Sequence, residues 1–293
     1  MTAAALELAN LCKNFDAVQV LKGITASVQA GEVIGLLGLN GAGKTTLLET
    51  ALGFSLPSSG SASIFGQNSI AMDGLTKARV GFVPQRDELL EGMKGDSYLA
   101  LIAEFYPSWN HGLVARLASE WAVPLDTRIN KLSVGQRQKL SIISALGHEP
   151  DLIILDEPVA SLDPVARRQF LKELVDIASS QTRTILFSTH IVSDLERVAS
   201  RVWLMQAGNL RIDASMDDLK ENFVRIQLPA GQLLPAAIAK NSVLHSRTDS
   251  RGVSIVLLKD WDAYSSRGLA SALGKDTQIE TLSLEDLFLE LHA

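Results

Sequence analysis

One segment of the chain combines the residue types that bind phosphate groups. Residues 38–46 read Gly-Leu-Asn-Gly-Ala-Gly-Lys-Thr-Thr and fit the pattern G-x-x-x-x-G-K-[ST]. Glycines let successive backbone N–H groups turn inward around phosphate oxygens, and Lys44 adds a full charge directed at β- and γ-phosphates. In such a loop the hydroxyl of Thr45 faces Mg²⁺. The segment predicts a nucleotide-phosphate site, with a glycine-rich turn as the alternative.

The elements expected on both sides of this loop suit that role. Residues 31–37 form a short apolar run typical of a buried strand, and residues 45–52 fit a helix that Gly53 ends. A phosphate loop needs this order of strand, loop and helix, and the helix N-terminus adds a partial positive charge. The loop residues expected to hold the nucleotide are Gly38, Asn40, Gly41, Ala42, Gly43, Lys44, Thr45 and Thr46.

Two adjacent carboxylates follow a second apolar strand. Residues 152–155 read Leu-Ile-Ile-Leu and are followed directly by Asp156 and Glu157. Ligands of open α/β sheets bind at the carboxyl ends of the strands, so we expect both acids near the phosphate loop. Asp156 would hold Mg²⁺ through water, and Glu157 would orient and deprotonate the attacking water. Alone, such a pair could equally be a solvated turn, but its combination with the loop favours phosphoryl transfer.

Composition and charge exclude several classes of protein. The 293 residues suffice for one large domain with an appendage, or for two modest domains. A formal net charge of −6 at pH 7 argues against a broad nucleic-acid surface, so we expect no nucleic-acid partner. No window approaches 18 apolar residues, no signal-peptide pattern is present, and Cys12 is the single cysteine. We therefore expect a cytoplasmic protein that acts at a membrane only through a partner.

The order of strand-like and helix-like runs predicts an α/β fold with two additions. Short β-like runs before the phosphate loop indicate an antiparallel layer, and residues 87–148 indicate an inserted helical subdomain. Its helices are expected at residues 98–106, 113–122 and 133–146. Strands at 152–155, 184–187 and 202–205, with a helix at 164–179, indicate a parallel sheet.

Near residue 214 the nucleotide motifs end, which predicts a boundary between two domains. We expect the nucleotide domain at residues 1–213 and a small α+β domain at 214–293. Within the second domain, strands are expected at 223–228 and 253–258, with helical stretches between and after them. The last helix, near 283–291, begins with a Ser-x-x-Asp pattern that suits a helix start.

Residues 132–136, Leu-Ser-Val-Gly-Gln, bring these motifs together as a family resemblance. With the phosphate loop, Gln85, Asp156-Glu157, residues 161–164 and His190, they resemble the ATPase cassette of ATP-binding cassette (ABC) proteins over about residues 4–212. The resemblance implies the α/β fold of a P-loop NTPase: a parallel-sheet core, an antiparallel β layer and an inserted helical subdomain. It also implies ATP and Mg²⁺ as ligands, and hydrolysis of ATP.

The resemblance further implies that two cassettes pair head to tail, either as two copies or as a chain with a homologous ATPase. ATP then lies between the phosphate loop of one chain and Ser133, Gly135 and Gln136 of the other. Ser133 is a good helix N-cap, and Gly135 lets backbone amides approach the γ-phosphate. Asp163 is implied to reach across the dimer interface. Val134 stands where the family commonly has glycine, a departure that bears on turnover more than on nucleotide binding.

Three further residues receive roles from the resemblance, and each has a structural alternative. Gln85 is implied to touch Mg²⁺ or the attacking water and to link the core to the helical subdomain, although it could be a turn residue. His190 is implied to reach the γ-phosphate, although histidines at strand ends are often structural. Phe15 is implied to stack on adenine, where the family often has tyrosine, although a core position is the alternative.

A single cassette without a membrane segment favours a transporter subunit. Residues 104–110 and 283–288 are similar to bacterial exporter ATPases of the drug- and antibiotic-resistance type, which implies a separate integral membrane permease and a place at the inner face of the cell membrane. A groove beside Gln85, lined by parts of residues 86–109, is implied to receive a helix of that permease. Alternatives are a soluble ABC ATPase outside transport and a nucleotide-dependent regulatory module.

Three aromatic residues of the helical block have two possible places. Tyr106, Trp109 and Trp121 could line this docking groove, or they could form the core of the helical subdomain.

Overall fold

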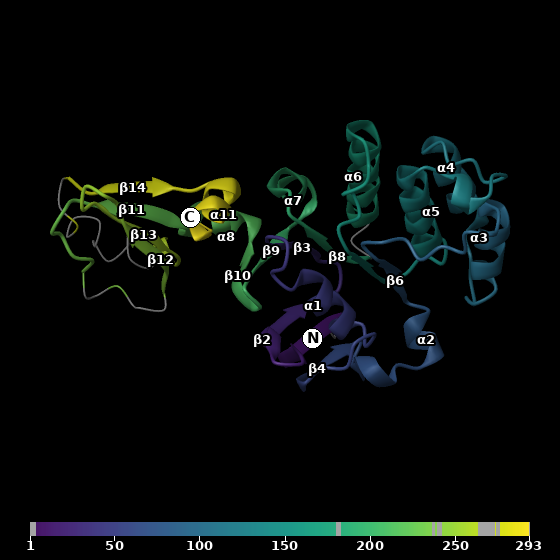
Figure 1. The fold of residues 1–293 in the computed structure, drawn as a ribbon, viewed down its shortest axis with the longest axis horizontal. Coiled ribbons are helices and arrows are strands. Elements are labelled where there is room, and N and C mark those ends of the chain that lie inside the picture. Colours follow the sequence, from purple (N-terminus) through teal and green to yellow (C-terminus); the bar gives the residue numbers. More distant parts are fainter. Residues whose placement is uncertain are drawn as a thin grey trace. The chain divides into compact units, whose positions relative to one another are not determined.

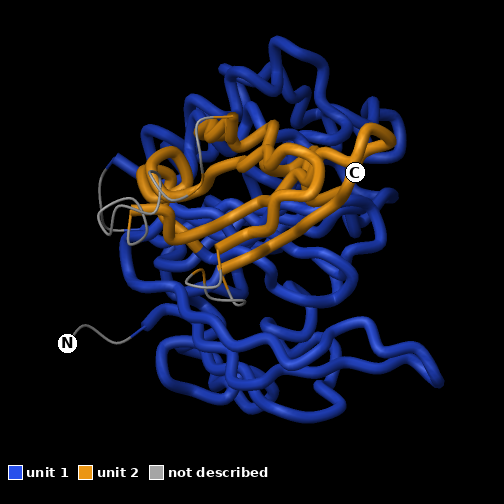
Figure 2. The backbone as a smooth tube through the Cα atoms, turned by 90° about the vertical axis from the view of Figure 1, so that its left-hand side faces the viewer, with its two compact units in different colours: residues 1–213 blue, residues 214–293 orange. Residues whose placement is uncertain are grey.

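The structure is a computed structural model that describes residues 4–179, 183–235, 238, 242–262, 273 and 276–292. Its contacts divide the chain into two compact units, Met1–Asp213 and Ala214–Ala293 (Figure 2). Among the described residues, no helix has the length and apolar character needed to cross a bilayer.

A six-stranded sheet forms the centre of the first unit (Figure 1). Its strand order is β10-β9-β3-β8-β7-β6, and the neighbours from β9 to β6 run parallel. The strands are β3 (Val33–Leu37), β6 (Val80–Val83), β7 (Leu152–Leu155), β8 (Thr184–Thr189), β9 (Arg201–Gln206) and β10 (Asn209–Ser215). Every residue of β3, β7 and β8 is buried, as expected of parallel strands covered on both faces. The predicted parallel sheet is confirmed.

An antiparallel sheet lies on the other side of helix α1 (Lys44–Ala51). Its strands, in the order β2-β1-β4-β5, are β1 (Leu6–Phe15), β2 (Val18–Val28), β4 (Ser59–Ile64) and β5 (Gln67–Asn68). Leu47 and Leu48 of α1 share one buried cluster with side chains of both sheets. This packing fixes the helix that begins at the end of the phosphate loop. Short helical segments η1 (Ser69–Ala71) and α2 (Gly74–Lys77) follow β5.

Three helices and a short 3-10 turn make up the predicted helical subdomain. They are α3 (Gly95–Ala103), α4 (His111–Glu120), η2 (Ile129–Lys131) and α5 (Val134–Leu146). Helix α3 begins and ends three residues earlier than the expected 98–106, and the N–H groups of Phe105 and Tyr106 donate to the carbonyl oxygens of Ile102 and Ala103 in a turn that follows it. Helix α4 starts two residues earlier, because the side chain of Asn110 caps it by accepting a hydrogen bond from the Leu113 N–H at 2.9 Å.

Two helices flank the parallel strands in the second half of this unit. Helix α6 (Pro164–Ser179) covers the range expected from sequence, and α7 (Val192–Val198) follows β8. Both lie between the strands that the alternating pattern indicated, which is the arrangement expected of a parallel α/β sheet.

The second unit contains a four-stranded antiparallel sheet in the order β12-β13-β11-β14. Its elements are α8 (Met216–Asn222), β11 (Val224–Leu228), β12 (Val243–Thr248), β13 (Ser254–Leu258), β14 (Gln278–Thr281) and α11 (Leu284–Leu291). The expected helix between β11 and β13 is wrong over β12, which pairs with β13. The sequence Val-Leu-His-Ser-Arg-Thr has little periodicity of its own, so its strand neighbour decides its conformation. The helical stretch expected after β13 lies largely outside the described residues.

Candidate nucleotide-binding site

The loop at 38–43 connects the buried strand β3 to α1. Gly41 and Gly43 have φ angles of 81° and 103°, a region that residues with a Cβ rarely adopt. Among the described residues no side chain caps the N-terminus of α1, so its first backbone N–H groups and its dipole face the loop. The loop therefore has the conformation and the donors required to surround a phosphate group.

Lys44 and Glu157 meet at the centre of the site. The Lys44 Nζ lies 3.2 Å from the Glu157 Oε1, and the two side chains are only 6% and 5% exposed. Lys44 also donates a hydrogen bond to the Gly38 carbonyl oxygen at 2.8 Å. Among the described residues Glu157 Oε1 accepts no hydrogen bond, so its contact with Lys44 is electrostatic. The sequence places these residues 113 positions apart, and the parallel sheet brings them together.

The carboxylate of Glu157 is held in place by strand β8. The Glu157 N–H donates to the Ser188 Oγ at 2.8 Å, and Ser188 Oγ donates to the Asp156 Oδ1 at 2.5 Å. The Glu157 Oε2 lies 2.9 Å from His190 Nδ1, which carries the proton when the carboxylate is ionised. Glu157 has a φ of 47°, an uncommon backbone conformation of the kind that concentrates at functional sites.

Ser188 is a residue of the site that the sequence alone did not indicate. It is completely buried and connects the backbone of Glu157 to the carboxylate of Asp156. The available signal was a hydroxyl residue following three apolar residues of a buried strand, two positions before His190. A serine in a strand is too common for that signal to assign a function.

A cavity of about 450 Å³ opens over the phosphate loop. It is lined by Phe15, Val20, Asn40, Gly41, Gly43, Lys44, Thr45, Thr46, Gln85 and Glu157. Val20 is the one lining residue that the sequence did not suggest. The Phe15 ring is 48% exposed and lies 4.7 Å from the Lys13 Nζ, so the core position considered for it is wrong. A volume of this order suits a small-molecule ligand.

The oxygen groups beside the loop fit a magnesium ion. Thr45 lines the cavity, and Asp156 is 1% exposed next to Glu157. Hydroxyl and carboxylate oxygens are ligands of the type that Mg²⁺ prefers, and Mg²⁺ usually keeps few protein ligands together with substrate phosphates. In the described part of the chain no three His, Cys, Asp or Glu side chains gather as a metal centre.

The remaining predicted site residues lie outside this cavity. Ser133 is exposed and forms a capping box with Gln136, whose Oε1 accepts from the Ser133 N–H at 3.0 Å. Asp163 caps α6 by accepting from the N–H groups of Ala166 at 3.0 Å and Val165 at 2.9 Å. These backbone hydrogen bonds, that of Ala166 first, hold the pKa of Asp163 below its ordinary value.

These two capped helix starts lie close together. A Cβ on Gly135 would be 3.4 Å from the Ser161 carbonyl oxygen. A single chain thus carries a phosphate cradle and, separately, a surface that includes the starts of α5 and α6.

The three aromatic residues Tyr106, Trp109 and Trp121 occupy different positions in the helical subdomain. Trp121 is 4% exposed and packs edge-on against Phe170, so it is a core residue. Tyr106 stacks on His148 with ring centroids 3.9 Å apart, and it lines a second cavity of about 470 Å³. Trp109 is half-buried against Gly147. Burial lowers the pKa of His148, whose Nε2 lies 3.2 Å from the Val80 carbonyl oxygen.

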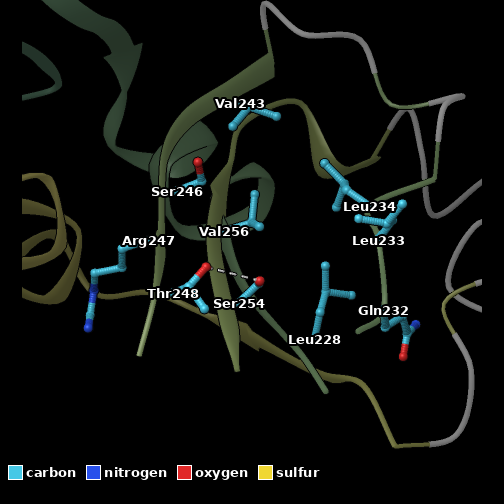
Figure 3. A pocket seen from close by; sticks show the side chains of 10 residues that line it. All are labelled: Leu228, Gln232, Leu233, Leu234, Val243, Ser246, Arg247, Thr248, Ser254 and Val256. Atoms are coloured by element: carbon cyan, nitrogen blue, oxygen red, sulfur yellow. Dashed lines mark hydrogen bonds between the residues drawn. The ribbon is translucent and has the colours of Figure 1, made fainter. Parts of the chain in front are cut away.

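The second unit has a cavity of its own, of about 360 Å³, on one face of its sheet (Figure 3). Aliphatic and hydroxyl side chains dominate its lining, and Thr248 and Ser254 face each other with their oxygens 3.4 Å apart. The charged residue of the lining, Arg247, is paired with Glu290 at 3.3 Å. This lining has no counterpart of the Lys44, Glu157 and His190 cluster.

Comparisons with known proteins agree with the geometry. A family model described as ABC transporter matches residues 21–160. The ABC transporter ATP-binding protein YtrB of Bacillus subtilis (strain 168) is 28% identical over 253 residues, 86% of each chain. The Nod factor export ATP-binding protein I of Burkholderia pseudomallei (strain 1710b) is 34% identical over 218 residues, 71% of this chain and 70% of that protein. A solved structure described as an ATP binding subunit of an ABC transporter aligns with a TM-score of 0.67 at 29% identity, over 74% of this chain and 92% of that one.

Proposed function

The chain belongs to the ATP-binding subunits of ABC transporters, and from this membership we propose that it hydrolyses ATP to drive export through a separate membrane subunit. The observation that carries the proposal is the contact between Lys44 and Glu157 at 3.2 Å beside the cavity. The phosphate-binding cation of Lys44 and the carboxylate of Glu157, which can orient water, therefore share one site.

The contacts of Glu157 suggest how nucleotide binding prepares the site for hydrolysis. Lys44 is the charge partner of Glu157 Oε1. The phosphates of ATP carry more negative charge than one carboxylate and attract Lys44 away from it. Oε1 is then free to accept a proton from the attacking water, while His190 holds Oε2 in place. Ser188 keeps the backbone of Glu157 in position throughout.

The other residues of the cavity complete the nucleotide site. Thr45, Asp156 and Gln85 hold Mg²⁺, which neutralises charge on the phosphate oxygens when it is bound. Phe15, exposed at the edge of the cavity, stacks on adenine. The loop residues Gly38, Asn40, Gly41, Ala42, Gly43 and Thr46 surround the phosphates with Lys44.

Two chains form one complete site. The exposed capping residue Ser133, with Gly135 and Gln136, contacts the γ-phosphate held by a second chain, and Asp163 lies at the same interface. In support of this proposal, none of these four residues lines the cavity of its own chain. The second chain is another copy or a homologous ATPase.

The partner and location follow from the same proposal. The relative named for Nod factor export supports the export direction. An integral membrane permease docks in the groove beside Gln85, which places the chain in the cytoplasm at the inner face of the membrane. The unit Met1–Asp213 is the ATPase domain, and Ala214–Ala293 is a separate C-terminal domain.

The proposal is tested by ATP turnover and nucleotide binding of purified protein. The wild type should hydrolyse ATP, and Lys44→Ala should weaken nucleotide binding because the main charge contact with the phosphates is lost. Lys77→Ala is a matched control, since Lys77 lies on α2 and does not line the cavity. A wild type that binds ATP without turning it over would contradict the motor function and favour a regulatory module.

A further inference from the structure

A buried ion pair outside the nucleotide cavity joins the first turns of α6 and α7. Arg167 on α6 donates two hydrogen bonds to the Asp194 Oδ1, from Nη2 at 2.6 Å and from Nε at 2.9 Å. The Asp194 side chain is 3% exposed, and that of Arg167 is 29% exposed. Helix α6 begins at Pro164 and α7 at Val192, so each partner lies in the first turn of its helix. The pair therefore fixes the start of α7 relative to the start of α6.

His190 lies between β8 and α7 and depends on the backbone there for its position. Its Nδ1 lies 2.9 Å from the Glu157 Oε2, and the ring makes no other hydrogen bond or ion pair with the described residues. The side chain is 44% exposed, so packing holds it only in part. Two polar contacts fix the surrounding backbone. The Ile191 N–H donates to the Thr189 Oγ1 at 3.0 Å on the strand side, and Asp194 is bound on the helix side.

Stability alone is a weak explanation for this pair. Taking a carboxylate and a guanidinium out of water costs free energy that their attraction can fail to offset, and an apolar pair of similar volume is often as stable. The second oxygen of Asp194, Oδ2, is buried and accepts no hydrogen bond from the described residues, so its desolvation is not compensated there. The pair does supply a fixed geometry, because two N–H groups of a planar guanidinium meet one oxygen.

We propose that Arg167 and Asp194 are positioning residues for ATP hydrolysis, which hold His190 against Glu157 by fixing the first turn of α7. Neither residue lines the cavity over the phosphate loop, so both act through His190. The inference rests on the proposed function, because it adds two residues to that hydrolytic site. When the pair is broken, the Glu157 Oε2 loses a fixed partner, and Oε1 no longer meets the attacking water in one orientation. The chemical step should slow, while the phosphate loop binds the nucleotide as before.

The experiment measures kcat and KM for ATP, together with nucleotide affinity, in the full-length chain. Asp194→Asn removes the charge and keeps the size of the side chain, and Arg167→Lys keeps the charge but removes the planar fork of donors. Each substitution is made alone and together with His190→Ala, so that its effect is measured with and without the residue it acts through. Single-turnover assays keep the slow variants measurable.

Glu173→Gln is the matched control for the loss of a buried ion pair. Glu173 also lies on α6, its side chain is 9% exposed, and its Oε1 lies 2.8 Å from the Arg116 Nη2. This pair joins α6 to α4 rather than to α7. Asp194→Asn and Glu173→Gln should therefore lower the midpoint of thermal unfolding by similar amounts, whereas only the effect of Asp194→Asn on kcat should depend on His190.

Asp194→Asn should lower kcat about tenfold and change KM by less than about twofold, because it misplaces a group used in the chemical step. It should have no further effect in a chain that already carries His190→Ala. Arg167→Lys should show the same pattern with a smaller loss. Glu173→Gln should change kcat by the same factor with and without His190.

Three results would overturn the inference and leave the proposed function standing. In the first, Asp194→Asn lowers kcat by the same factor with and without His190, so the pair only stabilises the fold. In the second, the wild type hydrolyses ATP and Asp194→Asn does so equally fast. In the third, His190→Ala leaves kcat unchanged. If Asp194→Asn does not fold, Arg167→Lys decides between the same results. A wild type that does not hydrolyse ATP would contradict the proposed function as well.

Discussion

The two units of this chain each bury a glutamate among basic side chains, and the two sites differ in what they leave open. In the first unit, Glu157 contacts Lys44 and His190. In the second, Glu290 accepts hydrogen bonds from Arg225 at 2.8 Å and from Arg247 at 3.3 Å. Their exposures are similar, 5% and 8%. Burial next to cations therefore does not by itself identify a reactive carboxylate.

The two glutamates differ in the hydrogen bonding of their carboxylate oxygens and in their backbone conformation. Both oxygens of Glu290 accept hydrogen bonds, which connect α11 to β11 and β12. Burial raises the pKa of Glu290, but the hydrogen bonds and charges of Arg225 and Arg247 outweigh it, so the pKa lies below its ordinary value. Glu157 instead has one oxygen that accepts no hydrogen bond from the part of the chain that the structure describes, a cavity beside it and a φ of 47°. Incomplete satisfaction and strain together indicate a functional group.

The largest expected effect is on turnover at the first glutamate. Glu157→Gln should lower ATP turnover by about 10³-fold, because an amide cannot take the proton of the attacking water. Nucleotide binding should remain, and ATP should promote a dimer, which sedimentation would detect. The variant should lose less folding stability than Glu290→Gln, because Lys44 keeps its bond to the Gly38 carbonyl. Unaffected turnover would show that Glu157 is not the base.

For Glu290 we expect the opposite pattern, a loss of stability with unchanged ATP turnover. Glu290→Gln should destabilise the C-terminal unit by about 2 kcal/mol, since a hydrogen bond to a charged group contributes roughly that much. Hydrogen exchange of β11 and β13 measures the loss, and ATP turnover should not change. Glu285→Gln, an exposed substitution on the same helix, is the control. A loss of turnover without loss of protection would end the contrast between the two glutamates.

The same glutamate predicts how the C-terminal unit responds to acid. Its pKa is lowered on folding from an ordinary value of 4.5, so its contribution is fully present above that pH. The contribution disappears as the pH falls through the folded pKa, when protonation breaks the pairs with both arginines. The protection of the β11 amides against hydrogen exchange, relative to their intrinsic exchange rate at each pH, should therefore fall more steeply below pH 4.5 in the wild type than in Glu290→Gln. An equal dependence on pH in the wild type and in Glu290→Gln would show that Glu290 is not the cause of the acid sensitivity.

Much of the first unit could be predicted because its chemistry lies in contiguous segments. The phosphate loop, the strand before Asp156 and the capped start of α5 each depend on local sequence, and β7 and α6 occur at the expected residues. The helix expected in place of β12 was wrong, because the pairing of that strand with β13 is not visible in its own residues. The Arg225 and Glu290 pair joins residues 65 positions apart and was not predicted.

Separation in sequence also explains why the surroundings of Glu157 could be predicted only in part. His190 could be located because it falls on a motif at the end of β8. Ser188 could not, because its importance comes from the parallel pairing of β7 with β8, which brings it to residues 31 and 32 positions earlier in the chain. Sequence motifs thus identify the reacting groups. The side chains that hold those groups in place can be identified only once the strand pairing of the sheet is known.

The smallest expected effect separates positioning from packing within one strand. Ser188→Ala leaves the buried N–H of Glu157 without its acceptor and Asp156 without a donor, so turnover should fall by about tenfold while nucleotide affinity changes little. The control is Thr184→Val, at the other end of β8, which removes a hydroxyl that accepts from the Gly31 N–H at 3.1 Å. Both variants lose one buried hydroxyl and should lose comparable thermal stability. If Thr184→Val lowered turnover as much as Ser188→Ala, the strand would act through stability alone. If only Ser188→Ala lowers turnover, Ser188 orients the strained backbone of Glu157 for the reaction. Glu290 differs, because its arginines stabilise the fold and take no part in catalysis.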